Sequence, residues 1–375
     1  MLDFIIKKLL LKYVLKHPLS YNQIDIQGLH DVLLNYQHRN HEEIVFDFEK
    51  ATSSQLLNRP VVAVSSGTAA LHLALAALNI GAGDLVAVPT FSYVASVNPV
   101  LYTGAKPVWI DSEETTWNIC PELLAKALKK FNTKSKRIKA IIVVHNYGVP
   151  ANMKEIMALA KRYAVPVIED AAEAWGASIN GRPCGSVGDI GVFSFNSNKT
   201  VTAFGGGLLT TLNSKWEKRT RFLASQARLP KSFYLFDEAG FNYRMSPLTA
   251  AYGLVQMKQS QHLVVKRQEI FTRYSQAFKN HPKISWAHPL EGDVASRWLS
   301  AFRFGTSLIP QKIAQSLENA GFEVRRGWNP LHTMKHLSAY PAINSNLSER
   351  LFQEVICLPS GAGSEQCLNA LRELI

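Results

Sequence analysis

Cysteine is scarce in this sequence: the 375 residues include four, at Cys120, Cys184, Cys357 and Cys367, and these lie far apart. Their spacing matches neither a cysteine metal site nor a dense disulfide pattern, so we expect no metal site and a reducing compartment. No apolar run is long enough to span a membrane. These absences favour a globular protein, which we expect to be cytoplasmic.

Charged residues are also few, at 19% of the chain, whereas hydrophobic residues make up 47%, which is typical of a folded protein rather than a disordered one. The 41 basic residues outnumber the 29 acidic residues and give a formal net charge of +12. A basic excess favours an anionic partner such as a phosphorylated substrate. Because the basic residues are scattered and lack interleaved aromatic residues, we expect no nucleic-acid partner.

Residues 1–17, MLDFIIKKLLLKYVLKH, are apolar, but lysines interrupt the run. No small-residue cleavage site follows, which argues against a signal peptide. Lys8, Lys12 and Lys16 recur every four residues and therefore share one face of a helix. This pattern favours a helix packed on the protein or on a second subunit. The alternative is a basic amphipathic helix in peripheral contact with a membrane surface.

Short apolar runs alternate with helix-type stretches from about residue 60. This alternation predicts an α/β fold with a mostly parallel central sheet and helices on both faces. Beyond residue 246 we expect one long helical region, 246–278, and then a small sheet with helices. The predicted parts are an N-terminal helical segment (1–50), a large α/β domain (51–250) and a small C-terminal α+β domain (251–375). The predicted strands are 61–65, 85–90, 107–111, 140–145, 166–171 and 190–195, and the predicted helices between them are 69–78, 121–130 and 153–163.

Residues 65–71, SSGTAAL, join a predicted strand to an Ala/Leu-rich helix. The free N–H groups in the first turn of such a helix form an anion site together with the helix dipole. Gly67 permits a close approach of the backbone and Thr68 adds a hydroxyl, so a phosphate group fits here. The alternative is ordinary N-capping by Ser66 or Thr68. The segment matches neither a Walker P-loop nor a GxGxxG motif.

Two acids, Glu169 and Asp170, lie at the end of another predicted strand. A carboxylate at a strand end can pair with a protonated ring nitrogen. Such a pair keeps the pyridine ring of a pyridoxal cofactor cationic and strengthens it as an electron sink. Asp170 suits this role, and the alternative is an acid that interacts with the dipole of a following helix.

A third predicted strand runs into polar residues and Lys199, with Ser194 five positions earlier and three glycines at 205–207. Lysine forms a Schiff base with an aldehyde when a desolvated or cationic setting lowers its pKa. The alternative is a solvated surface lysine. A phosphate cradle, a ring-nitrogen carboxylate and a lysine, each at a strand end and in that order, together predict a site for pyridoxal 5'-phosphate.

These residues resemble the DegT/DnrJ/EryC1/StrS family of sugar aminotransferases, which have the type I fold of aspartate aminotransferase. The resemblance runs from about residue 62 to about residue 359, and several motifs in a fixed order make it specific. The motifs are SSGTAALHLAL (65–75), VPTFSYVASVNPVLYTGAKPVWID (88–111), VVHNYGVPANM (143–153), VIEDAAEAWGA (167–177), FSFNSNK (193–199), GFNYRMSPLTAAYGLVQ (240–256) and, more weakly, WNPLH (328–332).

The resemblance implies a role for each motif residue. Lys199 would hold pyridoxal 5'-phosphate covalently and move a proton between cofactor and substrate. Asp170 would pair with the pyridine nitrogen. Gly67, Thr68 and Ser194 would bind the cofactor phosphate.

Four further residues are implied at the cofactor or at the neighbouring subunit. Tyr93 stands where the family places an aromatic ring that stacks on the cofactor; the alternative is a core tyrosine. Glu173 matches a position beside the cofactor hydroxyl. Asn242 and Arg244 match residues that reach the neighbouring subunit's site, which implies a homodimer with shared active sites. Alone, Arg244 would be taken for a surface or salt-bridge arginine.

The family implies transfer of an amino group from L-glutamate to a keto sugar carried on a nucleoside diphosphate, in amino sugar biosynthesis for lipopolysaccharide or another surface polysaccharide. The form FSFNSNK is most similar to members that act on the 4-keto group of UDP-linked N-acetylated 6-deoxysugars. A histidine in place of Lys199 would instead suggest the dehydratases of the family. Substrate contacts are implied for Asn196, Arg244 and His332.

Several alternatives to this substrate and activity remain open. The acceptor could be a 3-keto sugar or a GDP- or dTDP-linked sugar, or a small ketone used without a nucleotide. A non-catalytic regulatory or membrane-docking protein that binds the cofactor is a further alternative, against which Lys199 argues. Phe48 and Glu49 keep the FE pair of the family, but the SGWL…GP stretch that usually precedes it is missing. The sequence therefore does not identify the N-terminal residues that line the sugar pocket.

Overall fold

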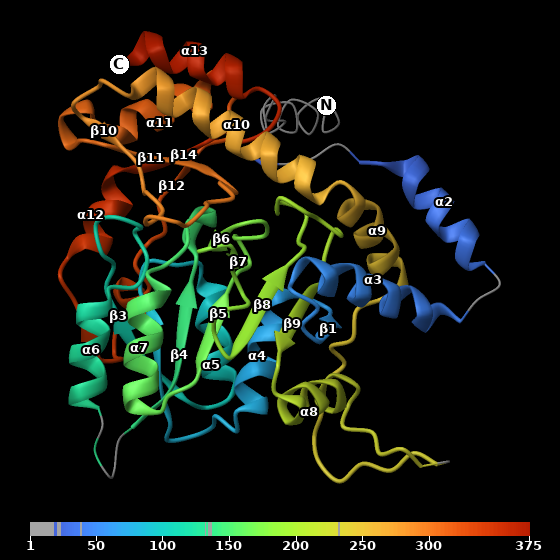
Figure 1. The fold of residues 1–375 in the computed structure, drawn as a ribbon. Helices are drawn as coiled ribbons and strands as arrows, with labels where there is room; N and C mark the ends of the chain where they lie inside the picture. Colours follow the sequence, from blue (N-terminus) through green and yellow to red (C-terminus); the bar gives the residue numbers. More distant parts are fainter. Residues whose placement is uncertain (1–18, 21–23, 38–39, 132, 134–136, 232) are drawn as a thin grey trace, which may run out of the picture.

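The structure is a computed structural model that describes residues 19–20, 24–37, 40–131, 133, 137–231 and 233–375. It contains a large sheet with helices on both faces and a smaller sheet built from the C-terminal part of the chain (Figure 1). This architecture confirms the predicted α/β fold. The segment 1–17, for which we predicted a packed or membrane-bound helix, lies outside the described residues.

Eight strands form the large sheet in the order β1-β9-β8-β5-β4-β2-β3-β13. Neighbouring strands are parallel except at β9, which is antiparallel to both β1 and β8. The six predicted strands are all present, whereas β9 and β13 were not predicted. The strands are β1 (Val61–Val64), β2 (Leu85–Pro89), β3 (Lys106–Ile110), β4 (Ile138–Val144), β5 (Val167–Asp170), β8 (Ile190–Ser194), β9 (Gly207–Thr211) and β13 (Ala342–Ile343).

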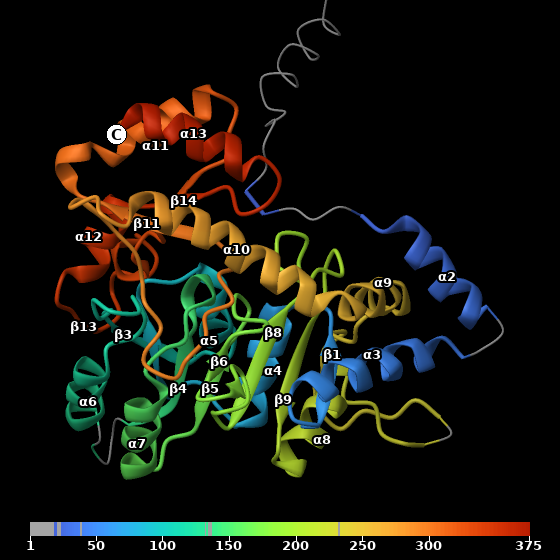
Figure 2. The ribbon, with the colours of Figure 1, turned by 45° about the horizontal axis from the view of Figure 1, so that its top comes forward.

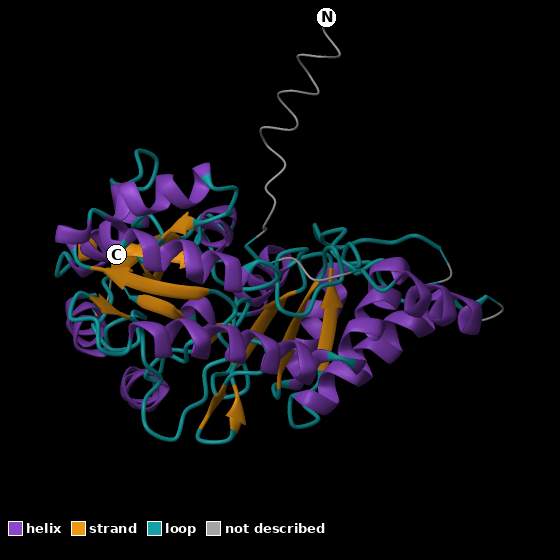
Figure 3. Cartoon of the chain, turned by 90° about the horizontal axis from the view of Figure 1, so that it is seen from above, coloured by secondary structure: helices purple, strands orange, loops and turns teal. Residues whose placement is uncertain are grey.

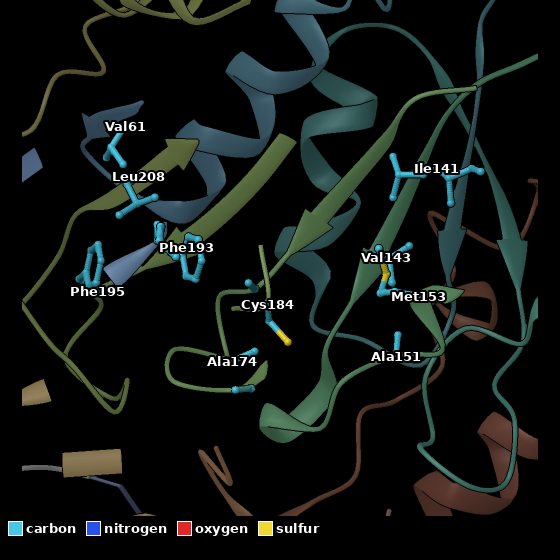
Figure 4. Packing of buried hydrophobic residues seen from close by; sticks show 14 of the residues in the cluster. Val61, Ile141, Val143, Ala151, Met153, Ala174, Cys184, Phe193, Phe195 and Leu208 are labelled. Atoms are coloured by element: carbon cyan, nitrogen blue, oxygen red, sulfur yellow. The ribbon is translucent and has the colours of Figure 1, made fainter. Parts of the chain in front are cut away.

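Both faces of the large sheet are buried. Val61 and Ala63 of β1 belong to one hydrophobic cluster, and Val62 and Val64 belong to a second cluster on the opposite face. This alternation follows from the pleat of a strand, which points successive side chains to opposite faces. Figure 4 shows part of the first cluster, in which Val61 lies beside Leu208, Phe193 and Phe195. Burial on both faces explains why these strands appear as continuous apolar runs in the sequence.

Helices cover the two faces in two groups (Figure 3). The first cluster includes residues of α3, α6, α7 and α9, and the second includes residues of α4, α5 and α8. The three helices predicted between the strands are confirmed as α4, α6 and α7. The helices are α3 (His41–Gln55), α4 (Gly67–Ala77), α5 (Asn98–Tyr102), α6 (Pro121–Lys130), α7 (Met153–Tyr163), α8 (Ser214–Ala224) and α9 (Pro247–Lys258), and α2 (Ile26–Tyr36) precedes them.

The predicted helical region 246–278 is helical, but it contains two helices rather than one. Helix α9 ends at Lys258, and α10 (Ser260–Phe278) begins after Gln259, whose ψ of 1° leaves the helical range. The two helices pack on different hydrophobic cores. Helix α9 contributes Ala250 and Ala251 to the core of the large sheet, whereas α10 contributes its apolar side chains to the core of the small sheet.

The small sheet has four strands in the order β10-β11-β14-β12, all paired antiparallel. Helices α10, α11 and α13 supply its hydrophobic core, and Figure 2 shows α11 and α13 on the side away from the large sheet. The division of the chain into three parts, with boundaries at residues 50 and 250, stays a prediction. The remaining elements are β10 (Ile284–Ser285), β11 (Ser300–Phe304), α11 (Pro310–Asn319), β12 (Arg325–Arg326), α12 (Leu347–Glu354), β14 (Val355–Leu358), α13 (Ser364–Leu374) and the hairpin of β6 (Ser178–Ile179) and β7 (Arg182–Pro183).

The four cysteines are free thiols. No group of histidine, cysteine and acidic side chains among the described residues is arranged to hold a metal ion. No described helix has both the length and the apolar character needed to cross a membrane.

The carboxylate of Asp111 joins β3 to the segment that follows β13. Although this carboxylate is fully buried, it accepts hydrogen bonds from Ser345 N and Oγ at 2.8 and 2.9 Å and from Leu347 N at 3.1 Å. It also accepts from both the N–H and the hydroxyl of Ser348. Burial alone would raise the pKa of Asp111, but these hydrogen bonds outweigh it and lower the pKa below the usual 3.8.

We predict that Asp111→Asn lowers the free energy of unfolding by about 3 kcal/mol, because several buried donors lose their acceptor. Urea denaturation should measure this loss, with Asp84→Asn as the control, because Asp84 accepts a single turn hydrogen bond from Gly81 N. Since the folded pKa of Asp111 is lowered, its stabilisation is present above the ordinary value of 3.8 and is lost as the pH falls through the folded pKa. A loss no larger than that of the control would contradict the prediction.

Candidate active site

A cavity of about 370 Å³ lies where the carboxyl ends of β5 and β8 meet the start of α4. This is the edge at which parallel α/β sheets bind ligands. Eight of the eleven predicted site residues line it: Gly67, Thr68, Tyr93, Asp170, Glu173, Ser194, Asn196 and Lys199. The structure therefore brings together residues from the three motifs that the sequence placed at strand ends.

The start of α4 forms one wall of the cavity. Ser66 caps the helix, because its Oγ accepts a hydrogen bond from Ala69 N at 3.0 Å. The backbone at Gly67 lies so close to β8 that a Cβ atom there would be 3.0 Å from the Cβ of Ser194. The N-cap is therefore present, and it does not exclude an anion site, since the cap engages one amide and the first turn of a helix leaves other amides without a partner in the helix.

Asp170 lies buried at the carboxyl end of β5. Its Oδ2 accepts a hydrogen bond from Ser96 Oγ at 2.7 Å, and its Oδ1 accepts one from Ala172 N at 3.2 Å. Burial raises the pKa of Asp170 above its ordinary value, and the Ser96 hydrogen bond opposes this effect. A cation placed in the cavity would stabilise the charged form of this carboxylate.

Lys199 extends into the cavity from the segment after β8, and its side chain is only 13% exposed. Its Nζ lies 4.0 Å from the centre of the Trp298 ring and 4.0 Å from Oε1 of Glu173. Burial lowers the pKa of Lys199, while the charges of Glu173 and Asp170 oppose the shift. A lowered pKa suits a lysine that reacts as a neutral amine, and this setting is not that of a solvated surface lysine.

Glu173 is the second buried acid beside Lys199. Its Oε2 accepts a hydrogen bond from Tyr147 N at 2.7 Å. Tyr147 has left-handed backbone angles, φ 55° and ψ 16°, which are rare for an aromatic residue and often accompany functional sites. Burial raises the pKa of Glu173 to about 7, although the charge of Lys199 acts in the opposite direction.

The two adjacent acids of β5 have different surroundings because successive side chains of a strand face opposite sides. Glu169 points into the core, where His145 Nε2 lies 2.9 Å from its Oε2. Because Ala151 N donates to His145 Nδ1 at 3.0 Å, the proton of this imidazole is on Nε2 and is donated to Glu169. Burial raises the pKa of Glu169, but His145 and backbone amides outweigh it and lower that pKa.

Sequence reasoning missed a second set of cavity residues, which includes Ser96, Trp298, Arg325 and Trp328. Ser96 holds Asp170, and Trp298 covers Lys199. Ser96 and Trp328 were within quoted motifs, 88–111 and 328–332, but no role was given to either. No spacing in the sequence marks Trp298 and Arg325, because they reach the cavity only through the packing of the small sheet.

A strap formed by Leu19 and Ser20 supports the lysine segment from outside the cavity. The carbonyl oxygen of Asn198 accepts hydrogen bonds from Ser20 Oγ at 2.8 Å and from Trp298 Nε1 at 2.7 Å. The buried guanidinium of Arg267 donates to Ser20 O at 2.6 Å. The strap therefore fixes the residue that precedes Lys199 against the small sheet.

Three of the predicted site residues do not line the cavity. His332 has both ring nitrogens engaged, with Thr90 Oγ1 at 2.7 Å and Glu349 Oε1 at 3.0 Å. Arg244 forms an exposed ion pair with Glu42 at 2.7 Å, and Asn242 is also exposed on the same segment. The structure does not bring these three to the cavity of their own chain.

The sequence pattern of the DegT/DnrJ/EryC1/StrS aminotransferase family matches residues 21–366. The chain belongs to this family. It is 40% identical over 325 residues to EpsN of Bacillus subtilis (strain 168), assigned as a pyridoxal phosphate-dependent aminotransferase, with 85% of this chain and 83% of EpsN covered. It is 34% identical over 329 residues to the GDP-perosamine synthase of Caulobacter vibrioides, with 85% of each chain covered.

Solved structures agree with this family assignment. The aminotransferase TlmJ from Streptoalloteichus hindustanus superimposes with a TM-score of 0.84 and 26% identity, over 96% of this chain and 98% of TlmJ. The predictions of the family, of the type I fold and of pyridoxal 5'-phosphate as cofactor are confirmed. The protein is a pyridoxal phosphate-dependent sugar aminotransferase.

The cavity of this family member fits the cofactor. A Cβ at position 67 would fill the cradle at the start of α4, and Asp170 is a buried carboxylate that a ring cation would stabilise. Pyridoxal 5'-phosphate supplies an aldehyde and an electron-withdrawing ring. We propose that Lys199 is its covalent attachment point and that Gly67, Thr68 and Ser194 hold its phosphate.

The side chains around the cavity are placed to affect the protonation of the Lys199 amine and of the cofactor's ring nitrogen. The neutral amine of Lys199 is suited to take a proton from the substrate carbon and to return it at the next position. Asp170 would keep the ring nitrogen protonated, and Trp298 shields the amine from water on one side. Tyr93 is 55% exposed and lies 5.5 Å from the Trp328 ring centre, so these two aromatic rings form the open side of the cavity.

We predict that Glu173→Gln shifts the pH dependence of cofactor uptake to lower pH. Uptake requires the neutral amine, and loss of the Glu173 charge removes an influence that raises the pKa of Lys199. The groups facing Glu173 are Lys199, Asp170 and the Tyr147 amide, and these stay in place. The measurement is the rate at which visible absorbance develops when pyridoxal 5'-phosphate is added to cofactor-free protein at a series of pH values.

The exposed Glu365→Gln variant is the control for this experiment, because it makes the same chemical change far from the cavity. It should retain the wild-type profile. A Glu173→Gln profile that coincides with wild type, or moves to higher pH, would show that Glu173 does not govern the ionisation of Lys199.

Proposed function

We propose that this aminotransferase moves an amino group from L-glutamate to the C4 keto group of a UDP-linked, N-acetylated 4-keto-6-deoxyhexose. The single observation that carries the reaction type is the amine of Lys199, buried between Trp298, Glu173 and Asp170 at the carboxyl edge of the sheet. The segment FSFNSNK, which ends at Lys199, supports the choice of acceptor through its resemblance to members with that substrate.

The shape and charge of the protein are compatible with a nucleotide-linked sugar. The cavity of about 370 Å³ is open on the side of Tyr93 and Asn196, so a long substrate can enter with its sugar toward Lys199. The net charge of +12 favours the approach of a diphosphate. We infer that Asn196, which is exposed beside the cavity, contacts the substrate.

A GDP-linked sugar is the second candidate acceptor. The observation that favours it is the 34% identity to a GDP-perosamine synthase over 85% of both chains. The two candidates require the same chemistry at Lys199 and differ in the nucleotide and in the sugar substituents.

We also propose that the protein is a homodimer with shared active sites. The segment of Asn242 and Arg244 supports this proposal, because it is exposed and lies outside the cavity of its own chain. Next to it, residues 233–236 expose the side chains of Phe233, Tyr234 and Phe236, an apolar surface that a second copy would cover. We further propose that His332 contacts the substrate, as the resemblance of segment 328–332 to the family implies.

We predict that the UDP-linked N-acetylated 4-keto-6-deoxyhexose is aminated with a kcat/KM at least about 10-fold above those of other acceptors, because a specific site leaves its polar groups unpaired with the wrong substrate. The panel contains UDP-, GDP- and dTDP-linked 4-keto sugars, a 3-keto sugar and a small ketone without a nucleotide. Labelled glutamate and mass spectrometry identify each product, and Lys199→Ala is the inactive control. The highest value for a GDP-linked sugar would replace the first candidate by the second.

We predict that inactive Lys199→Ala and Arg244→Ala chains regain activity when they are unfolded together and refolded as a mixture. Random pairing makes half of the dimers hybrids with one competent site each, so we expect about a quarter of wild-type activity. Each variant refolded alone is the control. If the mixture is no more active than the sum of the two controls, Arg244 does not serve the neighbouring site.

A further inference from the structure

Asp170 is held by a chain of two serine hydroxyls. Ser96 Oγ donates a hydrogen bond to Asp170 Oδ2 at 2.7 Å, and Ser92 Oγ lies 2.9 Å from Ser96 Oγ. A hydroxyl has one proton, so Ser96 cannot donate to both neighbours. Because an ionised carboxylate only accepts hydrogen bonds, the proton of Ser96 points to Asp170 and Ser92 donates to Ser96. Both hydroxyls are therefore oriented toward the carboxylate.

The two serines reach Asp170 from a different strand of the large sheet. Ser92 precedes and Ser96 ends the turn η1 (Val94–Ser96), which follows β2, whereas Asp170 ends β5. Strand β4 lies between β2 and β5, so the contact crosses the carboxyl end of β4. The two serines and Asp170 are all buried, and Ser96 and Asp170 line the active-site cavity. In such surroundings a hydrogen bond to a charged group is stronger than it is in water.

The contacts of Asp170 leave its carboxylate able to accept a further partner. A carboxylate has about four lone-pair positions, of which Ser96 occupies one on Oδ2 and the Ala172 amide occupies one on Oδ1. Burial raises the pKa of Asp170, and the Ser96 hydrogen bond is the largest of the influences that lower it. The charges of Lys199 and His145 act in the same direction as Ser96. Loss of the Ser96 hydroxyl would therefore shift Asp170 toward its neutral form.

We propose that Ser96, supported by Ser92, is a positioning residue that keeps Asp170 oriented and ionised for the ring nitrogen of the cofactor. A neutral carboxyl loses its attraction to a protonated ring nitrogen, and a carboxylate without this hydrogen bond rotates more freely. Ser96 thus affects the electron-withdrawing strength of the cofactor through Asp170. The inference rests on the proposed role of Asp170 at the ring nitrogen and is independent of which sugar is aminated.

The test compares two forms of the cofactor that differ only at ring position 1. Pyridoxal 5'-phosphate has a nitrogen there, whereas 1-deazapyridoxal 5'-phosphate has a C–H group. Each form is titrated into cofactor-free protein at one fixed pH. Quenching of tryptophan fluorescence gives its apparent Kd, because Trp298 and Trp328 line the cavity. Both forms have the aldehyde and the phosphate, so the Kd of the 1-deaza form divided by that of pyridoxal 5'-phosphate isolates the contribution of the ring nitrogen.

We predict that Ser96→Ala lowers this Kd ratio roughly 10-fold, as expected when one hydrogen bond to a charged group is lost. Most of the change should be in the Kd of pyridoxal 5'-phosphate, because the 1-deaza form has no ring nitrogen to pair with Asp170. Ser96→Thr keeps the hydroxyl and should keep the wild-type ratio. Ser92→Ala should give a smaller decrease, because the hydrogen bond between Ser96 and Asp170 remains.

Ser186→Ala is the matched control. Ser186 is fully buried outside the residues that line the cavity, and its Oγ donates to Pro183 O at 2.6 Å. The variant makes the same chemical change and should keep the wild-type Kd ratio. Thermal unfolding of each cofactor-free variant shows that it is folded before the titration.

Two outcomes with Ser96→Ala would overturn the inference. One is a wild-type Kd for pyridoxal 5'-phosphate, and the other is an equal loss of affinity for both forms, which would make Ser96 a packing residue only. Asp170→Asn separates these outcomes from failure of the underlying site assignment. If Asp170→Asn keeps the wild-type ratio, the role of Asp170 fails and this inference fails with it. If Asp170→Asn lowers the ratio and Ser96→Ala does not, only the role of Ser96 fails.

Discussion

The charge balance around one buried amine is the constraint on which the site depends. Lys199 is kept from water by Trp298 and faces two buried acids, Asp170 and Glu173. Burial disfavours the charged form of all three groups, the attraction between Lys199 and each acid favours it, and the two acids repel each other. The balance leaves an amine of lowered pKa beside two carboxyls of raised pKa.

The large sheet holds these groups because both of its faces are buried. Strands β5 and β8 are adjacent and parallel, so their carboxyl ends deliver Asp170 and Ser194 to the same edge. The small sheet then closes the other side with Trp298 and the strand that contains Arg325. Residues 19–20 join the two halves at the lysine segment through the carbonyl of Asn198.

Neighbouring residues of the same type serve different purposes here, and strand periodicity is the reason. Glu169 holds His145 in the core, while Asp170 faces the cavity. Arg326 packs on Phe352, while Arg325 faces the cavity. The face of the sheet to which a strand residue points therefore decides its role more than its residue type does.

The sequence by itself determined six of the eight strands of the large sheet, the three helices between them and the cofactor motifs, because apolar periodicity and local strand-to-helix signals are short-range. Gly67, Asp170, Ser194 and Lys199 each follow or end a predicted strand, and the carboxyl edge of a parallel sheet had to bring them together. Tertiary structure alone decided what surrounds them. The antiparallel β9, the break at Gln259 and the placement of Ser96, Trp298 and Arg325 depend on contacts between segments far apart in the chain, which no local pattern encodes.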